Sequence, residues 1–423
     1  MGTRKPSGTS EPILELNHLR FFLPTDLLSS FVLLPWQHAL ESWHDQGVKF
    51  LEVKSGLSRH VVRFIETGGR RFAVKETSRE TAQREYRTYL QLQAMGIRTL
   101  TPIGVVERFD GVDTMSTPIG LQPYERYTAY LVTELMEKVV PDAFLYKRGF
   151  TKENRRRIWY AVIELFVEMH SRGVYWGDAS LANMLIHFSS ELEPELGYRT
   201  KLRAVLADAE TVEIHPSLSE TLRRADVEFF IESMLWMEAD LRASGIVREP
   251  VITEDDQQMI LDVYSERYEV EQEMRSFEIV TQIDVDSLLG DFDTKGYGAI
   301  LLKHINEHKW YLSEREGHEV MLEDAAQNWY REVFRPVCRL FNEYDLSSFF
   351  PERTAASLYV RIMEHKYFMS KEAKKDVGIA AATWDYVVRF AESAPPQQTI
   401  RSLIQELKAL FRTLPAPLQS LYT

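Results

Sequence analysis

The chain has 423 residues, of which 44% are hydrophobic and 27% charged, and its formal net charge is −13. This composition is typical of a globular protein with enough length for two or three buried cores. The acidic balance disfavours a nucleic-acid partner, although "KENRRR" at 152–157 leaves room for a local basic patch. The single cysteine, Cys338, excludes an intramolecular disulfide framework and a cysteine-rich metal site.

The N-terminal region carries no targeting or membrane signal that we recognise. Residues 1–12 are polar and rich in Gly, Pro and Ser, and we expect them to be disordered. The apolar stretch at 21–36 is interrupted by two prolines and an aspartate, and it is too short to span a membrane. We therefore expect a soluble, cytoplasmic protein without a membrane span, in which residues 13–47 form an apolar, partly helical lead-in.

Residues 48–136 have the pattern of a small antiparallel sheet that holds one helix. The segments "KFLEVKSG", "RHVVRFIET" and "RRFAVKE" alternate with period two and are separated by turn signals. Helical spacing follows at 78–95, with Ser78 as the N-cap and Gly96 just beyond the end. Two further runs, "TPIGVVERFD" and "TAYLVTELM", complete a β-β-β-α-β-β order.

Residues 137–248 are mainly helical by pattern. An amphipathic helix is predicted at 152–172, and a second helix with an apolar stripe at 219–243. Between them, "RAVLADAETVEIH" at 203–215 is typical of a strand pair or of a strand and a turn.

Residues 249–423 are helical by pattern and contain an internal repeat. "HINEHKWYLSE" at 304–314 recurs as "RIMEHKYFMSK" at 361–371, and each copy leads into a helix with a tryptophan. We interpret the repeat as a duplicated helical hairpin. Two roles remain open for His308 and His365. They either belong to a polar face packed against aromatic neighbours or contact a ligand or phosphate. The first role is favoured.

Two charged residues match the first requirement of phosphoryl transfer from ATP, a lysine held by a carboxylate. Lys75 ends the third strand in "FAVKE", and Glu85 follows ten residues later in the helix. Taken singly, each residue fits a solvated surface position better than a functional one.

Three polar residues further along match the acceptor and magnesium requirements. "WGDASLAN" spaces Asp178 and Asn183 so that both side chains can face one cavity. Asp178 would orient a substrate hydroxyl or accept its proton, and Asn183 would bind a second Mg²⁺ among phosphate oxygens. Asp208 follows an apolar strand in "VLADAE" and would bridge Mg²⁺ to the β- and γ-phosphates. The order of these residues along the chain favours a kinase-like fold over a plain turn.

Two segments would complete a nucleotide site. The strand "AYLVTELM" would present its last residues to the adenine edge, and the loop in "KSGLSRHVVRF" would cap phosphates with a side chain and backbone amides. A plain buried strand and a hairpin turn are equally open, because the loop lacks the Gly-x-Gly-x-x-Gly pattern. The residues assigned to nucleotide binding are Gly56, Ser58, Arg59, Lys75, Thr133, Glu134 and Met136.

These residues resemble the protein-kinase-like superfamily, but not its ordinary protein-kinase members. Trp176 and Gly177 stand where a protein kinase has His-Arg, Ser180 stands where it has Lys, and "DAE" replaces Asp-Phe-Gly. The Asp-x-Ser-x-x-Asn spacing is similar to RIO-type atypical kinases. Gly before Asp is similar to the small-molecule kinases that act on aminoglycosides and choline.

A closer resemblance is to a bacterial family that joins a lipopolysaccharide-kinase-like N-terminal half to a helical C-terminal domain of unknown function. "SGLSRHVVRF", "REYRTYL", "YWGDASLANML" and "LADAETVEIH" resemble the first part, and "EHKWYLSE" and "FPERTAASLYV" the second. The resemblance implies an α+β, bilobal kinase-like fold with an antiparallel-sheet N-lobe (48–136), a mainly helical C-lobe (137–248) and an all-α C-terminal domain (249–423). It also implies that 187–204 is a protruding hairpin near the active site.

The resemblance implies an ATP- and Mg²⁺-dependent phosphotransferase that acts on a hydroxyl acceptor. A small molecule, sugar or lipid head group is favoured over a peptide, because no long activation segment precedes the helix at 219–243. The alternative is a catalytically weak, nucleotide-binding switch of the pseudokinase kind, or a variant that transfers AMP, whose C-terminal domain binds a protein partner. A ribosome-associated factor is disfavoured by the acidic balance.

Overall fold

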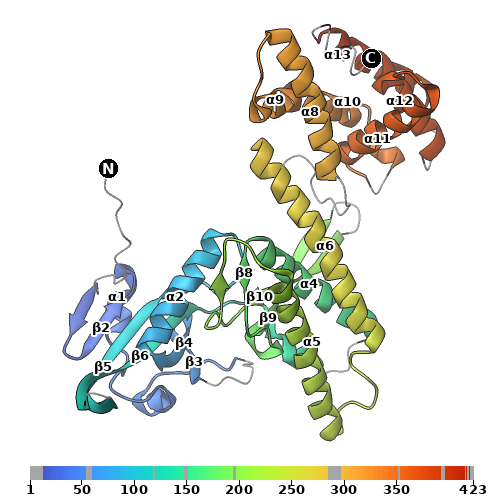
Figure 1. Ribbon diagram of the computed structural model, residues 1–423. Coiled ribbons are helices and arrows are strands. Elements are labelled where there is room, and N and C mark those ends of the chain that lie inside the picture. The colour runs from blue at the N-terminus through green and yellow to red at the C-terminus, as the bar shows by residue number, and fades with distance from the viewer. Residues whose placement is uncertain are drawn as a thin grey trace. The chain divides into compact units, whose positions relative to one another are not determined.

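The computed structural model describes residues 13–53, 60–117, 120–146, 151–193, 197–283, 297–350, 353–391 and 396–414, with 416 and 419 (Figure 1). The chain divides into two compact units, one up to Arg267 and one from Tyr268 onward. The division falls within a long helix, α6 (Glu254–Thr281). The domain boundaries expected from the sequence stay predictions, and the expected disorder of residues 1–12 lies outside the described residues.

The first unit contains a six-stranded antiparallel sheet in the order β1-β2-β5-β6-β4-β3. Helix α2 (Arg79–Ala94) follows β4 and begins at Ser78, whose hydroxyl accepts the backbone N–H of Thr81. The α+β class expected from the sequence is confirmed. The strands are β1 (Leu14–Leu16), β2 (Leu19–Phe22), β3 (Val62–Thr67), β4 (Arg70–Ser78), β5 (Pro102–Thr117) and β6 (Gly120–Glu134).

Two expectations about this sheet need correction. The lead-in contributes β1 and β2 as well as α1 (Thr25–Phe31) and a 3₁₀ helix (Leu40–Gln46), so it is not simply helical. The strand expected at "KFLEVKSG" is wrong for its described residues, where Phe50 forms only an isolated bridge with Ile65. Alternation with period two does not separate a paired strand from an extended segment.

Alternation along β4 sends its side chains to opposite faces of the sheet. Phe72 and Val74 are buried against the aromatic cluster of the lead-in, in which the rings of Trp36 and Trp43 lie 4.9 Å apart. Ala73 and Lys75 therefore point to the other face, where the cleft described below opens. The lead-in thus supplies the core of one face and leaves the other for a ligand.

The rest of the first unit is mainly helical, with two small sheets. Gly173 lies just after the end of helix α4 and has a φ of +78°, and a Cβ there would lie only 2.1 Å from the carbonyl oxygen of His215, so only glycine fits. Strands β9 and β10 pair antiparallel along their described length, which confirms the expected hairpin. The elements are β7 (Val139–Pro141), α3 (Asp142–Tyr146), α4 (Lys152–Ser171), β8 (Val174–Tyr175), a 3₁₀ turn (Leu181–Asn183), β9 (Met184–Glu193), β10 (Gly197–Leu206), β11 (Glu213–Ile214) and α5 (Glu220–Ala243).

In the second unit, the described residues from 297 onward form helices and connecting turns. Trp329, Phe341 and Tyr359 lie fully buried in its core, which also includes Phe277 of α6. In the described part of the chain, no helix combines the length and apolar character needed to cross a bilayer. The helices are α8 (Tyr297–Glu316), α9 (Leu322–Trp329), a π-helical turn (Tyr330–Phe334), α10 (Arg335–Glu343), a 3₁₀ helix (Leu346–Phe349), α11 (Ala355–Ala373), α12 (Gly378–Phe390) and α13 (Gln397–Arg412).

The internal repeat corresponds to two helical hairpins with matching hydrogen bonds. His308 Nε2 lies 2.8 Å from Asn328 Oδ1, and His365 Nε2 lies 2.7 Å from Asp385 Oδ2, each partner being 20 residues further along the chain. Both histidines therefore link the two helices of their own hairpin, α8 to α9 and α11 to α12.

Two further contacts repeat at the same spacing. Lys309 and Lys366 each bind a carboxylate ten residues later, both at 2.9 Å. Ser313 and Ser370 each accept the backbone N–H of the residue seven positions later, at 3.0 and 3.2 Å. The short sequence echo thus reflects a duplicated hairpin whose two copies share their internal hydrogen bonds.

Candidate active site

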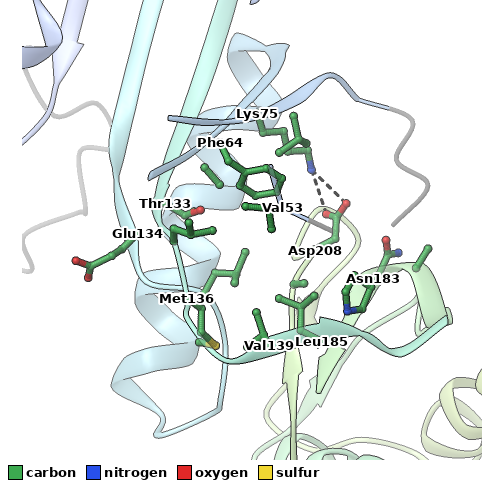
Figure 2. A pocket seen from close by; sticks show the side chains of 17 residues that line it. Val53, Phe64, Lys75, Thr133, Glu134, Met136, Val139, Asn183, Leu185 and Asp208 are labelled. Atoms are coloured by element: carbon green, nitrogen blue, oxygen red, sulfur yellow. Dashed lines mark hydrogen bonds and ion pairs between the residues drawn. The ribbon is translucent and has the colours of Figure 1, made fainter. Parts of the chain in front are cut away.

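A cleft in the first unit lies between the sheet and the segments around β7 and β9 (Figure 2). Its walls are largely apolar and its polar end contains Lys75, Asn183 and Asp208. The lining residues are Val53, Val62, Phe64, Ala73, Lys75, Leu100, Thr133, Glu134, Leu135, Met136, Val139, Pro141, Ala182, Asn183, Leu185, Ala207 and Asp208.

Lys75 is the centre of the polar end. Its Nζ lies 2.9 Å from Oε2 of Glu85 and 3.2 Å from Oδ2 of Asp208 (Figure 2 shows the Asp208 contacts). The Lys75 side chain is 13% exposed and that of Glu85 only 1%. The structure therefore brings together three of the residues selected from the sequence, although Asp208 is 133 positions from Lys75.

The carboxylates keep Lys75 charged despite its burial. Burial lowers the pKa of this ammonium group, but Glu85 and Asp208 outweigh burial and raise the pKa above its ordinary value. Burial in turn raises the pKa of Glu85, against the opposing effect of Lys75. The group that faces the cleft is thus a fixed positive charge at neutral pH.

Tyr89 supports this ion pair and was not selected from the sequence. Its hydroxyl lies 3.0 Å from Oε1 of Glu85 and 2.8 Å from the carbonyl oxygen of Ala207, next to Asp208. The tyrosine is four residues after Glu85 on α2, so the two side chains share one helix face. That spacing is the signal that sequence reasoning overlooked.

Glu210 places a third carboxylate near Lys75. Its Oε2 lies 3.9 Å from Lys75 Nζ and 3.0 Å from Nε2 of His60. His60 precedes β3 and Glu210 follows β10, so this contact joins segments far apart in the sequence beside the polar end of the cleft. Neither residue was selected from the sequence.

Hydrogen bonds to two of its backbone carbonyl groups hold the loop that carries Asp178 and Asn183. Nδ2 of Asn183 donates to the carbonyl oxygen of Asp178 at 3.1 Å, and the amide of Ala207 donates to the carbonyl oxygen of Asn183 at 2.9 Å. The second bond joins this loop to the segment of Asp208. Asn183 lines the cleft, whereas Asp178 lies on the same loop and is not among the lining residues.

A buried network on α5 fixes the start of this loop. Asp226, 1% exposed, accepts the backbone N–H of Trp176 at 2.7 Å and of Gly177 at 2.8 Å. Nε2 of His170 lies 3.1 Å from the same carboxylate, and its Nδ1 lies 2.7 Å from the hydroxyl of Tyr264. Burial lowers the pKa of His170, more than Asp226 raises it, so the ring is neutral. The signal missed in the sequence is an aspartate on the apolar stripe of a helix.

Of the residues expected to bind the nucleotide, some line the cleft and others lie outside the described residues. Thr133, Glu134 and Met136 line the cleft, with Thr133 only 5% exposed. The side chain of Glu134 points away from the cleft in Figure 2 and pairs with Arg70 at 3.1 Å, so only its backbone is left for a ligand. Gly56, Ser58 and Arg59 lie outside the described residues.

Apolar side chains form most of the cleft and were largely missed. Val62 and Phe64 of β3, Ala73 of β4 and Leu185 of β9 surround it. Val62 and Phe64 are two positions apart on one strand, as Ala73 is from Lys75, so period-two alternation already places each pair on one face. The sequence contained this signal.

The donor set of the cleft suits magnesium held jointly with phosphates. Among the described residues, no group of three His, Cys, Asp or Glu side chains is placed to hold a metal ion. The cleft offers one carboxylate, Asp208, and one amide, Asn183. Mg²⁺ is bound in this way in nucleotide sites, through one or two carboxylates with phosphate oxygens and waters completing its shell.

Comparison with known families agrees with this geometry. Residues 69–208 match the lipopolysaccharide kinase (Kdo/WaaP) family. The chain carries a kinase-like domain. The match begins just before β4 and ends at Asp208, so it contains both Lys75 and the loop of Asp178. Residues 323–390 match a domain of unknown function, DUF4032, and both parts of the expected resemblance are confirmed.

Solved structures of kinases are also similar to the chain. WaaP in complex with acyl carrier protein is 19% identical, with 54% of this chain and 84% of that chain covered and a TM-score of 0.34. The RIO2 kinase–ADP/Mg²⁺–phosphoaspartate complex from Chaetomium thermophilum is 12% identical, covering 57% of this chain and 76% of that chain with a TM-score of 0.30. No curated protein matches the sequence.

Proposed function

We propose that the kinase-like domain is an ATP- and Mg²⁺-dependent phosphotransferase that transfers the γ-phosphate to a hydroxyl acceptor. A small molecule, sugar or lipid head group suits it better than a peptide. The observation that carries the proposal is the position of Lys75 Nζ, 2.9 Å from Glu85 and 3.2 Å from Asp208 at the polar end of an apolar cleft. Burying charges is costly, and such groups are often retained for a function rather than for stability.

The apolar walls of the cleft would bind the adenine of ATP, and the fixed lysine would bind its phosphates. Phe64, Ala73 and Leu185 would contact the adenine, and the backbone of 134–136 would bind its polar edge. Lys75 would bind the α- and β-phosphates, while Glu85 holds the ammonium group in place.

Asn183 and Asp208 would hold Mg²⁺ together with the phosphates. When bound, the ion neutralises charge that develops on the transferred phosphoryl group. Asp208 contacts Lys75 in the structure, so binding of ATP·Mg²⁺ would exchange part of this ion pair for contacts to phosphate and metal.

Asp178 would act on the acceptor hydroxyl. Its carboxylate would take the proton as the acceptor oxygen forms a bond to the γ-phosphorus and the bond between that phosphorus and the ADP oxygen breaks. Asp226 would position the loop through Gly177, and Asn183 through its bond to the Asp178 carbonyl.

Turnover of ATP labelled at the γ-phosphate tests this proposal. We expect release or transfer of label by the wild type, and a loss of at least about a hundredfold in Asp178→Ala and in Asp208→Asn. Asp113→Asn, at an exposed position of β5, is the matched control and is expected to keep full activity.

Two outcomes would replace the proposal by its alternatives. Transfer of label from the α-phosphate would indicate an AMP-transferring enzyme. Binding of ATP without transfer of either label to any acceptor or to water would indicate a nucleotide-dependent switch, in which the C-terminal unit binds a protein partner.

A further inference from the structure

A second pocket in the first unit shares no lining residue with the cleft. It is formed by the end of α3, the first turn of α4 and the segment between α5 and α6. We propose that this pocket binds the phosphate group of a small phosphorylated molecule. The lining residues are Tyr146, Arg155, Ile246, Val247, Arg248, Glu249, Pro250 and Val251.

The segment that forms one wall is fixed without a ligand. Oε2 of Glu238 on α5 accepts the backbone N–H groups of Val251 and Ile252 at 2.8 and 3.1 Å. Oε1 of the same carboxylate pairs with Arg242 at 2.9 Å. The wall is therefore preorganised, which lowers the entropy cost of binding.

The tyrosine of the pocket is fixed as well. Nε1 of Trp159 donates to the hydroxyl oxygen of Tyr146 at 3.1 Å, and Tyr146 is only 2% exposed. The Tyr146 hydroxyl also interacts with the side chain of Asp142, so this group fixes the wall of the pocket.

The cations at the start of α4 fall into two groups. Lys152 and Arg156 lie 3.5 and 3.6 Å from Oδ1 of Asp256, a buried residue in the first turn of α6. Arg155 lies in the same helical turn and lines the pocket, to which the segment between α5 and α6 adds Arg248. The basic segment seen in the sequence thus contributes both to an ion-pair link with α6 and to the lining of the pocket.

Two guanidinium groups give the pocket its chemistry. Arg248 forms no ion pair or hydrogen bond with any residue that the structure describes. Guanidinium groups bind phosphate oxygens in pairs of hydrogen bonds, and a site with two arginines favours a phosphate over a single carboxylate. Glu249 is the one lining residue with the opposite charge, and it opposes binding of an anion.

The nearest buried acid does not add negative charge to the site. Asp142, one helical turn before Tyr146 on α3, is completely buried. Burial raises the pKa of its carboxyl group to about 8, so at pH 7 the group is mostly neutral. The region that surrounds the pocket therefore repels an anion less than the sequence suggests.

Anion binding here has to be local, since the whole chain has a formal charge of −13. Titration calorimetry of the full chain in Mg²⁺-free buffer tests it, with inorganic phosphate and glycerol 3-phosphate as separate probes. We expect binding of glycerol 3-phosphate, weakened at least about tenfold by Arg155→Gln or Arg248→Gln. Glu249→Gln is expected to strengthen binding, because it removes the opposing charge.

Two further variants distinguish this pocket from the cleft and from a general effect of charge. Lys75→Met alters the cleft and is expected to leave this binding unchanged, so the result does not depend on the proposed phosphotransfer. Arg224→Gln removes an exposed arginine of α5 that pairs with Glu228, and it controls for loss of one positive charge.

Several results would overturn the proposal. These are unchanged binding in both arginine variants, loss of binding in Lys75→Met, or no detectable binding of either probe at millimolar concentration. Equal binding of the two probes would indicate a site for free phosphate rather than for a phosphorylated molecule. If Arg155→Gln fails to fold, Arg248→Gln decides the outcome, because Arg248 is exposed and its side chain holds no other described residue in place.

Discussion

The carboxylate of Asp226 accepts the backbone N–H of Gly177 at 2.8 Å, and Gly177 directly precedes Asp178. Gly177 has a φ of +80°, and a Cβ there would lie 3.1 Å from the carbonyl oxygen of Thr211. The loop therefore depends both on a glycine conformation and on a buried acid from α5. A helix well apart in sequence fixes the position of the proposed catalytic aspartate.

Replacement of Asp226 by alanine should destabilise the first unit. The change leaves the buried N–H of Trp176, the partly buried N–H of Gly177 and His170 without their acceptor, which should lower the free energy of unfolding by about 3 kcal/mol. Urea unfolding followed by circular dichroism measures the effect. Asp240→Ala, an exposed position on the same helix, is the control. A loss no larger than that of the control would contradict the role given to Asp226.

His304 should make the stability of the second unit depend on pH. Burial, with smaller effects of Lys366 and Lys303, lowers its pKa to about 3. The unfolded chain therefore binds a proton below about pH 6.5 that the folded unit excludes. Stability should be complete above pH 6.5 and fall by about 1.4 kcal/mol per pH unit as pH decreases toward 3.

Denaturant unfolding between pH 7 and pH 5 measures the effect of His304 on stability, because most carboxylates titrate below this range. His304→Leu should reduce the slope of the pH dependence, because it removes the group with the larger shift; burial also lowers the pKa of His308, whose contribution would remain. His318→Leu replaces an exposed histidine of the same unit and should retain the slope. An unchanged slope in His304→Leu would show that another group is responsible.

Filling the cleft at Ala73 should block the proposed nucleotide. Ala73→Leu adds atoms on the face that also carries Lys75, and we expect ATP·Mg²⁺ to bind at least about tenfold more weakly. The readout is the ATP-induced rise in melting temperature, which follows from mass action. Ala94→Leu, at an exposed position of α2, should keep the full rise. A full rise in Ala73→Leu would place the nucleotide elsewhere.

The histidine contacts of the two hairpins should contribute to stability with a different dependence on salt. Asp385 binds both His365 and Arg389 at 2.7 Å, which holds its pKa low despite partial burial, whereas Asn328 gives His308 a neutral partner. Asp385→Asn should cost about 0.5–1 kcal/mol at low salt and less in 1 M NaCl.

Asn328→Ala should cost about 1 kcal/mol at both salt concentrations, because no charge is involved. Unfolding curves at the two ionic strengths provide the comparison. Equal salt dependence in the two variants would argue against an ionic contact at Asp385 and a neutral one at Asn328.

Much of the fold followed from local signals. The predicted starts of α2 and α5 agree with the structure because Ser78 and Ser219 cap them with their hydroxyl groups. Strands β1 and β2 were missed because they are short and lie in an apolar run whose pattern does not distinguish strand from helix. The pairing of β2 with β5 depends on a partner about 85 positions away, which only the tertiary structure supplies.

The candidate site was predictable only for residues whose order along the chain matches the order that phosphoryl transfer requires. Lys75, Glu85 and Asp208 were selected because phosphoryl transfer requires such groups in that order. Tyr89 and Asp226 act on these residues through hydrogen bonds that cross between elements. The approach of Glu210 to Lys75 likewise depends on the path of a loop. Residues that only position the site residues through hydrogen bonds have no fixed spacing from them along the chain, so a single sequence does not reveal them.

The duplicated hairpin determines where the chain can be cut. The segment that matches DUF4032 begins at residue 323, between His308 and its partner Asn328. A fragment started there would remove α8, expose the buried faces of α9 and α11, and keep only one complete hairpin. Because Phe277 of α6 also belongs to the same core, a fragment meant to fold independently should begin no later than Tyr268.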